Sequence, residues 1–414
     1  MAVTAGVRKP AGRPERQWLG QWNSSVTSYY LLVGATALLL IIGLVMVLSS
    51  STVTSIAAGE SPYAEGLKQA RFALIGLPLM LVAARLPVRW YKRLAWPALV
   101  VAIALQSLTL VPALGRAAGS NVGWIHVGGV TVQPAEIAKL ALALWLGAVL
   151  GRKQHLLGSV GHALVPAVPG ALVVFGLVMA GNDLGTAMIV AGLVAGAMWV
   201  AGAPARLLLP LGAAGAAAVV LYAVVDNSNR MSRILATYGG CTDPGGECYQ
   251  SLHGLYGLGT GGLFGVGLGA SREKWRYLPE AHNDFIFAIL GEELGLLGTL
   301  SVLALFVALG VAMARVVRRH PDPFVKITTA AVACWIVGQA FLNIGVVVGV
   351  FPVIGVPLPL VSAGGSALVA TMVALGMVIS FARSEPGAAE ALAARDGVVR
   401  RSMAVLGRGR RDAR

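Results

Sequence analysis

The feature that most constrains the fold of this chain is a series of long apolar runs separated by shorter polar segments. Each run is close to the roughly 20 residues that an α-helix needs to cross a bilayer. The runs cover residues 30–50, 72–87, 95–113, 136–151, 165–181, 184–201, 206–226, 285–315, 325–350 and 361–383. Only 12% of the 414 residues are charged, whereas a typical soluble domain has about 25%. The sequence predicts an all-α membrane protein, a polytopic bundle of about ten transmembrane helices.

Basic residues gather in alternate loops and in both tails, which accounts for the formal net charge of +14. The positive-inside rule places these segments and both chain ends in the cytoplasm. We expect a basic cytoplasmic tail at 1–29, a transmembrane domain at 30–383 and a second basic tail at 384–414. A large polar loop at 227–284 and a shorter one at 114–135 then face outward. Because the charge follows membrane topology, we expect no nucleic-acid partner.

The outward loop ends in a polar stretch that is rich in glycine. Within Gly254–Gly269, three glycines fit the dinucleotide-binding spacing G-x-G-x-x-G by chance, since no β-α-β unit surrounds them. An interfacial or re-entrant segment, in which glycines permit close helix approach, is the better interpretation. Cys241 and Cys248 share this loop, where a disulfide and two free thiols are both compatible with the sequence. A zinc site lacks further ligands.

Asp284 is the last polar residue before the apolar run that begins at Phe285, and we predict that it is the catalytic residue. A carboxylate at this position can contact water on one side and a lipid-anchored ligand on the other. The same loop carries candidate substrate-binding residues, namely Arg230, Arg233, Lys274, Arg276, Glu280 and His282. Cations can hold a pyrophosphate and stabilise it as a leaving group, while a carboxylate takes a proton from an attacking hydroxyl. This set suits a phosphate-bearing glycosyl donor.

Polar residues of other spans are expected near the same outer side. Glu136 and Lys139 share one helix face at i, i+3 spacing, which suits either a salt bridge that orients the helix or a contact with substrate. Trp124 suits either stacking on a sugar ring or anchoring at the membrane interface. Further polar groups lie near outer span ends, namely Asp183, Gln339, Asn343, Ser362 and Ser366. We predict that Ser362 and Ser366 contact substrate.

Five sequence blocks resemble the SEDS family, which includes the peptidoglycan polymerases FtsW and RodA and the sporulation protein SpoVE. The blocks are YLPEAHNDFIFAILGEELGLLG (277–298), VQPAEIAKLAL (132–142), NDLGTA (182–187), NRMSRI (229–234) and LPLVSAGGSAL (358–368). The resemblance runs from about residue 30 to residue 383, and LPEAHNDFIF is highly specific. With the Gly-Glu-Glu-Leu-Gly run that follows, it looks more like the division members of the family than the elongation members.

The resemblance implies a ten-span helical fold that polymerises lipid II into β-1,4 glycan strands at the outer face of the cytoplasmic membrane. It assigns the essential outward aspartate to Asp284, and the Glu and Lys of a helix motif to Glu136 and Lys139. It also assigns a loop tryptophan to Trp124, although Gly123 stands where relatives often carry Arg. The partners it implies are a class B penicillin-binding protein, other division proteins and membrane lipids, at the division septum.

Other functions compete with this one. A lipid II flippase is favoured by Glu292, a carboxylate about two turns into the eighth span. An elongation polymerase of the RodA type and a scaffold that acts through its basic tails are also considered. The sequence requires no cofactor and no metal ligand is predicted. Glu280 and Asp284 nevertheless offer oxygen ligands for Mg²⁺ or Mn²⁺, although a carboxylate acting only as a base needs no metal.

Overall fold

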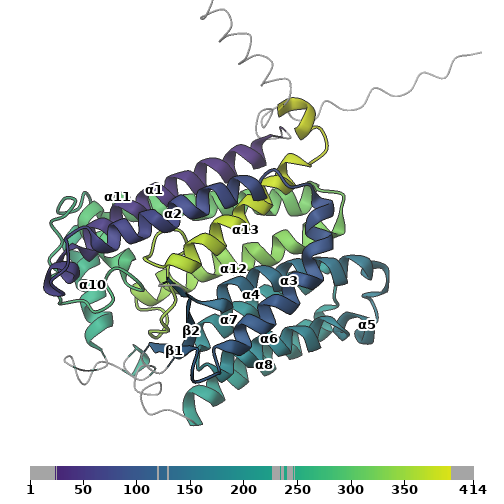
Figure 1. The fold of residues 1–414 in the computed structure, drawn as a ribbon, viewed down its shortest axis with the longest axis horizontal. Coiled ribbons are helices and arrows are strands. Elements are labelled where there is room, and N and C mark those ends of the chain that lie inside the picture. The colour runs from purple at the N-terminus through teal and green to yellow at the C-terminus, as the bar shows by residue number, and fades with distance from the viewer. Residues whose placement is uncertain are drawn as a thin grey trace, which may run out of the picture.

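The computed structural model describes residue 24 and residues 26–118, 121–127, 130–225, 234, 237–239, 246 and 248–392. Ten long helices of this part match the ten apolar runs, and most of them lie roughly side by side (Figure 1). They are α1 (Thr27–Ala57), α2 (Ala64–Ala83), α3 (Val88–Leu108), α4 (Pro134–Arg152), α6 (Ala167–Ala180), α7 (Leu184–Ala201), α8 (Ala205–Val225), α11 (Ile286–Arg319), α12 (Pro323–Val347) and α13 (Gly365–Arg383). Eight described segments are long and apolar enough to span a membrane. The predicted fold class is confirmed.

The bundle has two chemically different ends. At one, which we call the terminal end, α1 begins and α13 ends; the short helices η2 (Gln154–Leu156) and α5 (Val160–Leu164) lie there as well (Figure 1). At the other, the loop end, lie the helix α10 (Tyr249–Gly261) and three short strands. Basic residues of the connections α2–α3, α4–α5 and α11–α12 all lie at the terminal end.

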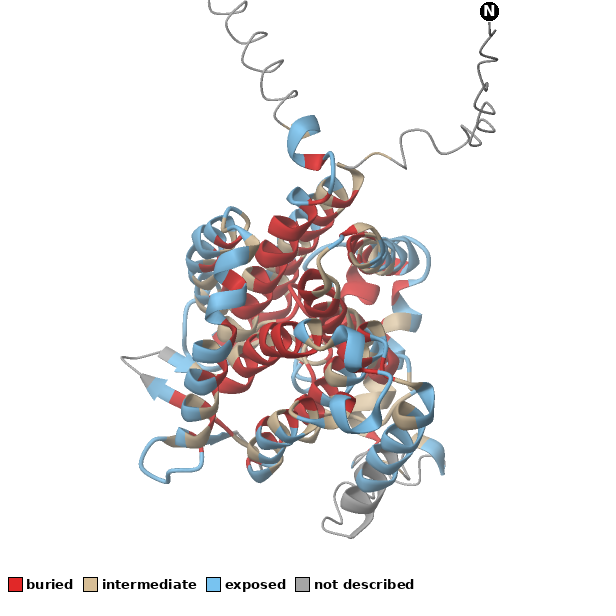
Figure 2. Ribbon diagram, turned by 90° about the vertical axis from the view of Figure 1, so that its right-hand side faces the viewer, coloured by how far each residue is buried: buried red, intermediate tan, exposed pale blue. Residues whose placement is uncertain are grey.

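The helices α4, α12 and α13 form the centre of the molecule, and α12 is 61% buried in its most apolar window. In its most apolar window α4 is 83% buried and α13 is 72% buried, whereas the outer helix α2 is 22% buried. Figure 2 shows the buried residues gathered in the middle and the exposed residues around the outside. The outward apolar side chains of the peripheral helices, such as Leu74 and Ile75, are those that a bilayer would cover.

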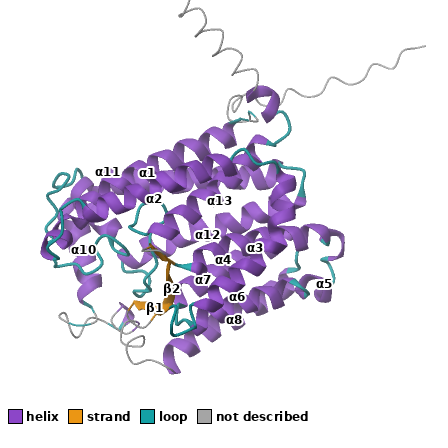
Figure 3. Cartoon of the chain, viewed as in Figure 1, coloured by secondary structure: helices purple, strands orange, loops and turns teal. Residues whose placement is uncertain are grey.

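A small antiparallel sheet in the loop at 114–135 was not anticipated from the sequence. Its strands are β1 (Gly115–Ala118), β2 (Asn121–Val127) and β3 (Val130–Val132), in the order β1-β2-β3 (Figure 3). Arg116 of β1 pairs with Trp124 of β2 in this register. Because directly paired residues of antiparallel strands point to the same face, the cation and the indole are neighbours on one side of the sheet.

The helix α11 is broken at Gly295, where φ is +67° and ψ is −165°. The backbone groups released at the break bond to the loop that follows α10. Val266 N and Gly267 N donate to the carbonyls of residues 292 and 293, and the N–H groups of residues 296 and 297 donate back to residues 262 and 263. A broken helix is tolerated within a membrane protein when such bonds satisfy its backbone.

The glycine-rich helix α10 packs against the first turns of α11. A Cβ at Gly254 would meet the Phe285 ring, and one at Gly261 would collide with the carbonyl oxygen of Gly291. The glycines therefore permit the close helix approach that the sequence indicates.

Candidate functional site

Asp284 lies at the loop end, half-buried, two residues before α11 begins at Ile286. The connection between α12 and α13 approaches its side chain from the other direction. A Cβ built on Gly355 would lie 3.5 Å from Asp284 Oδ2, and Gly355 has a φ of +76°. This conformation favours glycine. Two loops that are distant in sequence therefore meet at the carboxylate.

Three donors fix the backbone that carries Asp284. The carbonyl oxygens of residues 282, 283 and 284 each accept one hydrogen bond from another element. Ala363 N donates to the first at 2.9 Å, Ser362 Oγ to the second at 2.7 Å and Asn343 Nδ2 to the third at 2.7 Å. Ser362 is 5% exposed, so it positions this segment. A reacting carboxylate gains from such rigid support, since small misplacements slow catalysis strongly.

The side chains of α12 extend this support. Asn343 Nδ2 also donates to Val356 O at 2.7 Å, and Gln339, one turn earlier, donates to Pro357 O at 2.9 Å. From α2, Gln69 Nε2 donates to Ser362 O at 3.1 Å. These amides tie the connection at 356–364 to the helices on both sides of it. The position of Gly355 beside Asp284 is therefore set by buried hydrogen bonds.

Glu136 and Lys139 form a buried ion pair of 2.8 Å at the start of α4. Their residues are only 2% and 1% exposed. Lys139 Nζ also donates to Gln339 Oε1 at 2.9 Å and lies 4.8 Å from the centre of the Trp335 ring. The pair thus contacts the same amide that holds the connection beside Asp284. Its location supports an orienting role, and Glu136 Oε2 is buried without a partner in the described part of the chain.

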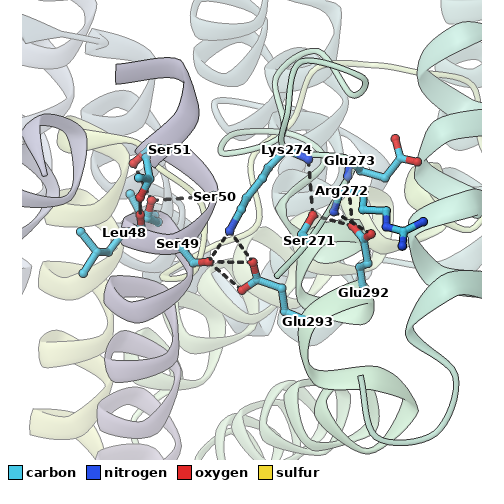
Figure 4. A network of polar contacts seen from close by, with 12 residues as sticks. Leu48, Ser49, Ser50, Ser51, Ser271, Arg272, Glu273, Lys274, Glu292 and Glu293 are labelled. Atoms are coloured by element: carbon cyan, nitrogen blue, oxygen red, sulfur yellow. Dashed lines mark hydrogen bonds and ion pairs between the residues drawn. The ribbon is translucent and has the colours of Figure 1, made fainter. Parts of the chain in front are cut away.

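Lys274 lies in a second buried network, at the junction of α1 and α11 (Figure 4). Its ammonium contacts Glu293 Oε1 at 2.9 Å and Ser49 Oγ at 3.3 Å, and its side chain is 4% exposed. Burial of a lysine is costly unless a carboxylate pairs with it. The positive charge of Lys274 is therefore neutralised within the fold, which separates it from the exposed cations of the same loop.

Glu292 binds the loop at 271–273, which precedes Asp284 in the chain. Its carboxylate accepts hydrogen bonds from Ser271 Oγ, from Arg272 N at 2.9 Å and from Glu273 N at 3.3 Å (Figure 4). Its residue is 1% exposed. Glu292, the acid that favoured a transport function, therefore has its carboxylate oxygens bonded to this loop.

The neighbouring Glu273 has a shifted pKa. Burial raises the pKa of its carboxyl group, and a hydrogen bond and the charge of His253 oppose that rise.

Three predicted substrate residues lie in the same segment as Asp284. Arg276 and Glu280 are exposed, and both adopt left-handed backbone conformations, with φ of +71° and +55°. Glu280 Oε2 accepts a hydrogen bond from Asn283 Nδ2 at 2.6 Å. His282 is half-buried, and its Nδ1 is buried without a partner among the described residues. Arg276 and Glu280 are thus accessible to a ligand and close in sequence to the carboxylate, whereas Nδ1 of His282 is covered.

Trp124 and Ser366 come from two further elements of the loop end. Trp124 is half-buried on β2, opposite the exposed Arg116. Ser366 Oγ accepts from Gln133 N at 3.0 Å, and Gln133 Nε2 donates to Asp183 Oδ2 at 3.1 Å. The sheet is thereby anchored to the starts of α7 and α13.

Other predicted residues lie outside the described part of the chain: Arg230, Arg233 and Cys241. Cys248 is disulfide-bonded, and Cys334 is free. Within the described residues there is no group of three or more His, Cys, Asp or Glu side chains suited to a metal ion. The substrate roles of the residues at the site stay predictions.

Sequence reasoning missed Gly355, Arg116 and Gln69. Gly355 and Gln69 act through contacts with segments more than 70 residues away, so neither spacing nor hydropathy marks them. Arg116 had one available signal: the dipeptide Gly119-Ser120 stands between it and Trp124, and such a dipeptide between two short runs is typical of a β-hairpin sequence.

Comparison with known proteins places this chain among relatives of one family. Residues 29–386 match the family model of FtsW, RodA and SpoVE, described as cell cycle protein. The probable peptidoglycan glycosyltransferase FtsW of Mycobacterium tuberculosis is 40% identical over 93% of this chain and 73% of its own. The protein of that name from Halorhodospira halophila is 38% identical over 91% of this chain and 94% of its own. A solved chain from work on coordination of polymerization and crosslinking by a peptidoglycan synthase complex is 26% identical. It has a TM-score of 0.70 and covers 85% of this chain and 96% of its own.

Proposed function

This chain belongs to the FtsW/RodA/SpoVE family of cell cycle proteins, and from that premise we propose how its loop end carries out the family's chemistry. The protein is a membrane-embedded peptidoglycan glycosyltransferase. We infer that it polymerises lipid II into β-1,4 glycan strands and that Asp284 is the general base. The observation that carries this proposal is the half-buried carboxylate of Asp284, supported by three hydrogen bonds to residues 282–284.

In the proposed reaction, Asp284 takes the proton from the 4-hydroxyl of the acceptor sugar. The hydroxyl oxygen attacks the anomeric carbon of the donor, and the bond from that carbon to the pyrophosphate oxygen breaks. Polyprenyl pyrophosphate leaves, and cations of the loop end stabilise its developing charge. Arg276 is exposed in the same segment as Asp284, and the exposed Arg116 lies beside Trp124, which suits a sugar–phosphate ligand.

The distribution of charge supports an orientation for the molecule. Basic connections lie at the terminal end, so by the positive-inside rule we propose that this end faces the cytoplasm and the loop end the outer side of the inner membrane. Lipid-linked substrate then meets Asp284 on the outer side. We propose that the protein acts at the division septum, which the names of its relatives support. Its proposed partner is a class B penicillin-binding protein, supported by the synthase-complex neighbour.

The flippase alternative loses its main support, because the carboxylate of Glu292 accepts three hydrogen bonds from the loop at 271–273. A polymerase and a flippase are separated by one experiment. Purified protein with its transpeptidase partner is supplied with labelled lipid II, and the glycan product is followed on gels.

We expect Asp284→Asn to abolish polymer formation, because the amide cannot accept the proton, and to leave thermal stability close to that of the parent. Glu60→Gln, which removes an exposed carboxylate at the same end, is the matched control and keeps full activity. Polymer that persists in Asp284→Asn would remove Asp284 from the mechanism. We also propose that the base acts without a resident metal, so a chelator in the same assay leaves the rate unchanged.

A further inference from the structure

An apolar groove lies far from Asp284, between α7, α8, α11 and α12. It is an open groove of about 610 Å³, lined almost wholly by apolar atoms of these helices, with one charged residue, Arg318, among its lining residues. The helix α8 packs on α7. Since α7 also packs directly on α12, and α12 on α11, the groove lies between α8 and α11, with α7 and α12 as its floor. It plays no part in the proposed glycosyl transfer.

Small residues keep this groove open. A Cβ on Gly192 would meet nothing within 4 Å, and Gly192 belongs to the groove lining. Gly196 lies one turn further along α7 and faces Cys334. A Cβ at Gly196 would collide with the sulfur of Cys334. The contact between Gly196 and Cys334 thus packs α7 against α12, whereas Gly192 faces unfilled space. An unfilled apolar space of this size within a membrane protein is suited to a hydrocarbon chain.

The length of the groove selects the kind of occupant. Its lining covers Gly192–Val200 on α7 and Gly310–Arg318 on α11, which is about 12 Å along each helix at roughly 1.5 Å per residue. Half of a hydrocarbon core is about 15 Å. Both stretches lie in the last turns before the terminal end. The hollow part of this face therefore matches the depth of one leaflet, and exposed apolar side chains such as Val307 and Phe341 continue the face toward the loop end.

A cation lies at the mouth of the groove. Arg318 is exposed, and no described carboxylate pairs with it. Its neighbours are engaged: Arg319 lies 3.7 Å from Glu385, and Arg315 donates to Ser24 O at 3.2 Å. An unpaired guanidinium at the membrane surface attracts an anionic headgroup and binds phosphate oxygens well.

We propose that this groove binds one acyl chain of an anionic phospholipid of the cytoplasmic leaflet, whose phosphate contacts Arg318. The ligand class follows from three properties: an apolar lining, the length of one leaflet and a positive mouth. The assignment to the cytoplasmic leaflet rests on the orientation given under the proposed function. It is independent of the chemistry of Asp284.

Native mass spectrometry of the full-length protein, purified in mild detergent and titrated with phosphatidylglycerol or phosphatidylcholine, tests the proposal. We expect the parent to retain one phosphatidylglycerol in preference to phosphatidylcholine. Gly192→Leu fills the groove and removes this retained lipid. Gly176→Leu is the matched control, because Gly176 is also exposed on a helix with nothing within 4 Å of its Cβ but lies on α6, outside the groove. It retains lipid as the parent does.

Arg318→Gln keeps the groove and removes the charge. The preference for phosphatidylglycerol over phosphatidylcholine then falls by about fivefold, the equivalent of about 1 kcal/mol for one cation at the surface. Equal retention by Gly192→Leu and the parent would overturn the proposal, as would a preference unchanged by Arg318→Gln. Displacement of the lipid by polyprenyl pyrophosphate at equimolar concentration would instead assign the groove to the tail of the substrate. Asp284→Asn retains the lipid, so failure here and failure of the proposed function are distinguishable.

Discussion

At the scale of single residues, the space beside Asp284 depends on a glycine. Gly355→Ala adds a methyl group 3.5 Å from Asp284 Oδ2 and strains a backbone with φ of +76°. We expect polymerisation to fall about tenfold or more, because the methyl group takes up space against the carboxylate that the acceptor hydroxyl has to enter. Gly349→Ala is the control, since its φ is +78° and its nearest neighbour is a leucine methyl group at 3.8 Å. It carries the same strain but keeps its activity. Equal losses of polymerisation in both variants would show that backbone strain, and not the contact with Asp284, explains the effect.

The buried ion pair of Lys274 and Glu293 gives a second prediction at this scale. Lys274→Met leaves the Glu293 carboxylate buried without its partner, which costs about 3–5 kcal/mol of unfolding free energy. Replacing both, with Lys274→Met and Glu293→Leu together, restores most of that loss. The exposed pair of Lys68 and Glu65 is the control, and Lys68→Met costs about 1 kcal/mol or less. Thermal unfolding in detergent compares these three variants with the parent. A Lys274→Met protein as stable as the parent would contradict the role of the ion pair in folding.

The sequence predicted some of these residue roles and could not predict others. The i, i+3 spacing of Glu136 and Lys139 is a local property of one helix, and the ion pair is present. Lys274 was grouped with the substrate cations because a lysine in a polar loop has the same local signal whether it faces water or a buried acid. Its partner, Glu293, is determined only when α11 and the loop pack together.

At the scale of elements, the contact between α10 and α11 depends on which glycine faces it. Gly261→Ala drives a methyl group into the Gly291 carbonyl, so we expect a loss of about 1–3 kcal/mol from overpacking. Gly259→Ala, on the same helix but with nothing within 4 Å, is neutral or slightly stabilising. Melting temperatures of the purified variants test the difference. A Gly261→Ala protein as stable as Gly259→Ala would mean that α10 does not pack this closely.

The sequence specifies some elements more closely than others. The ten spans were predictable because length and hydropathy are properties of contiguous residues. Their predicted bounds differ from those of the helices by up to eight residues, at the start of α2. The sheet of β1–β3 and the break at Gly295 were not. Both depend on hydrogen bonds to another segment, namely the pairing of Arg116 with Trp124 and the exchange between 262–267 and 292–297.

At the scale of the whole molecule, His320 joins the end of α11 to the end of α13. Nε2 lies 3.2 Å from Ser384 Oγ, and Nδ1 accepts from Asp322 N at 3.1 Å. Burial lowers the pKa of His320 below its ordinary value of 6.5, against the opposing effects of Asp322. The unfolded chain therefore binds the proton more tightly, and the stability that neutral His320 contributes is complete above pH 6.5. It is lost as the pH falls below that value.

We therefore expect the melting temperature to fall between pH 7.5 and pH 5.5, and His320→Gln to reduce that fall, because this variant has no proton to bind there. His155→Gln, which changes an exposed histidine at the same end, leaves the fall unchanged. The same drop in the parent and in His320→Gln would assign the pH dependence to other groups.

The break at Gly295 divides α11 into two helical segments, a longer part and a shorter part. The longer part, from Leu296 to Arg319, is about 36 Å at roughly 1.5 Å per residue, enough to cross the bilayer alone. The shorter part carries Asp284 at its tip and is bonded to the loop at 262–267. The same loop also accepts hydrogen bonds from the N–H groups of residues 296 and 297 of the longer part, so it bridges the break and joins the two parts. A bilayer that holds the longer part in place therefore also sets the height of the catalytic acid above the membrane.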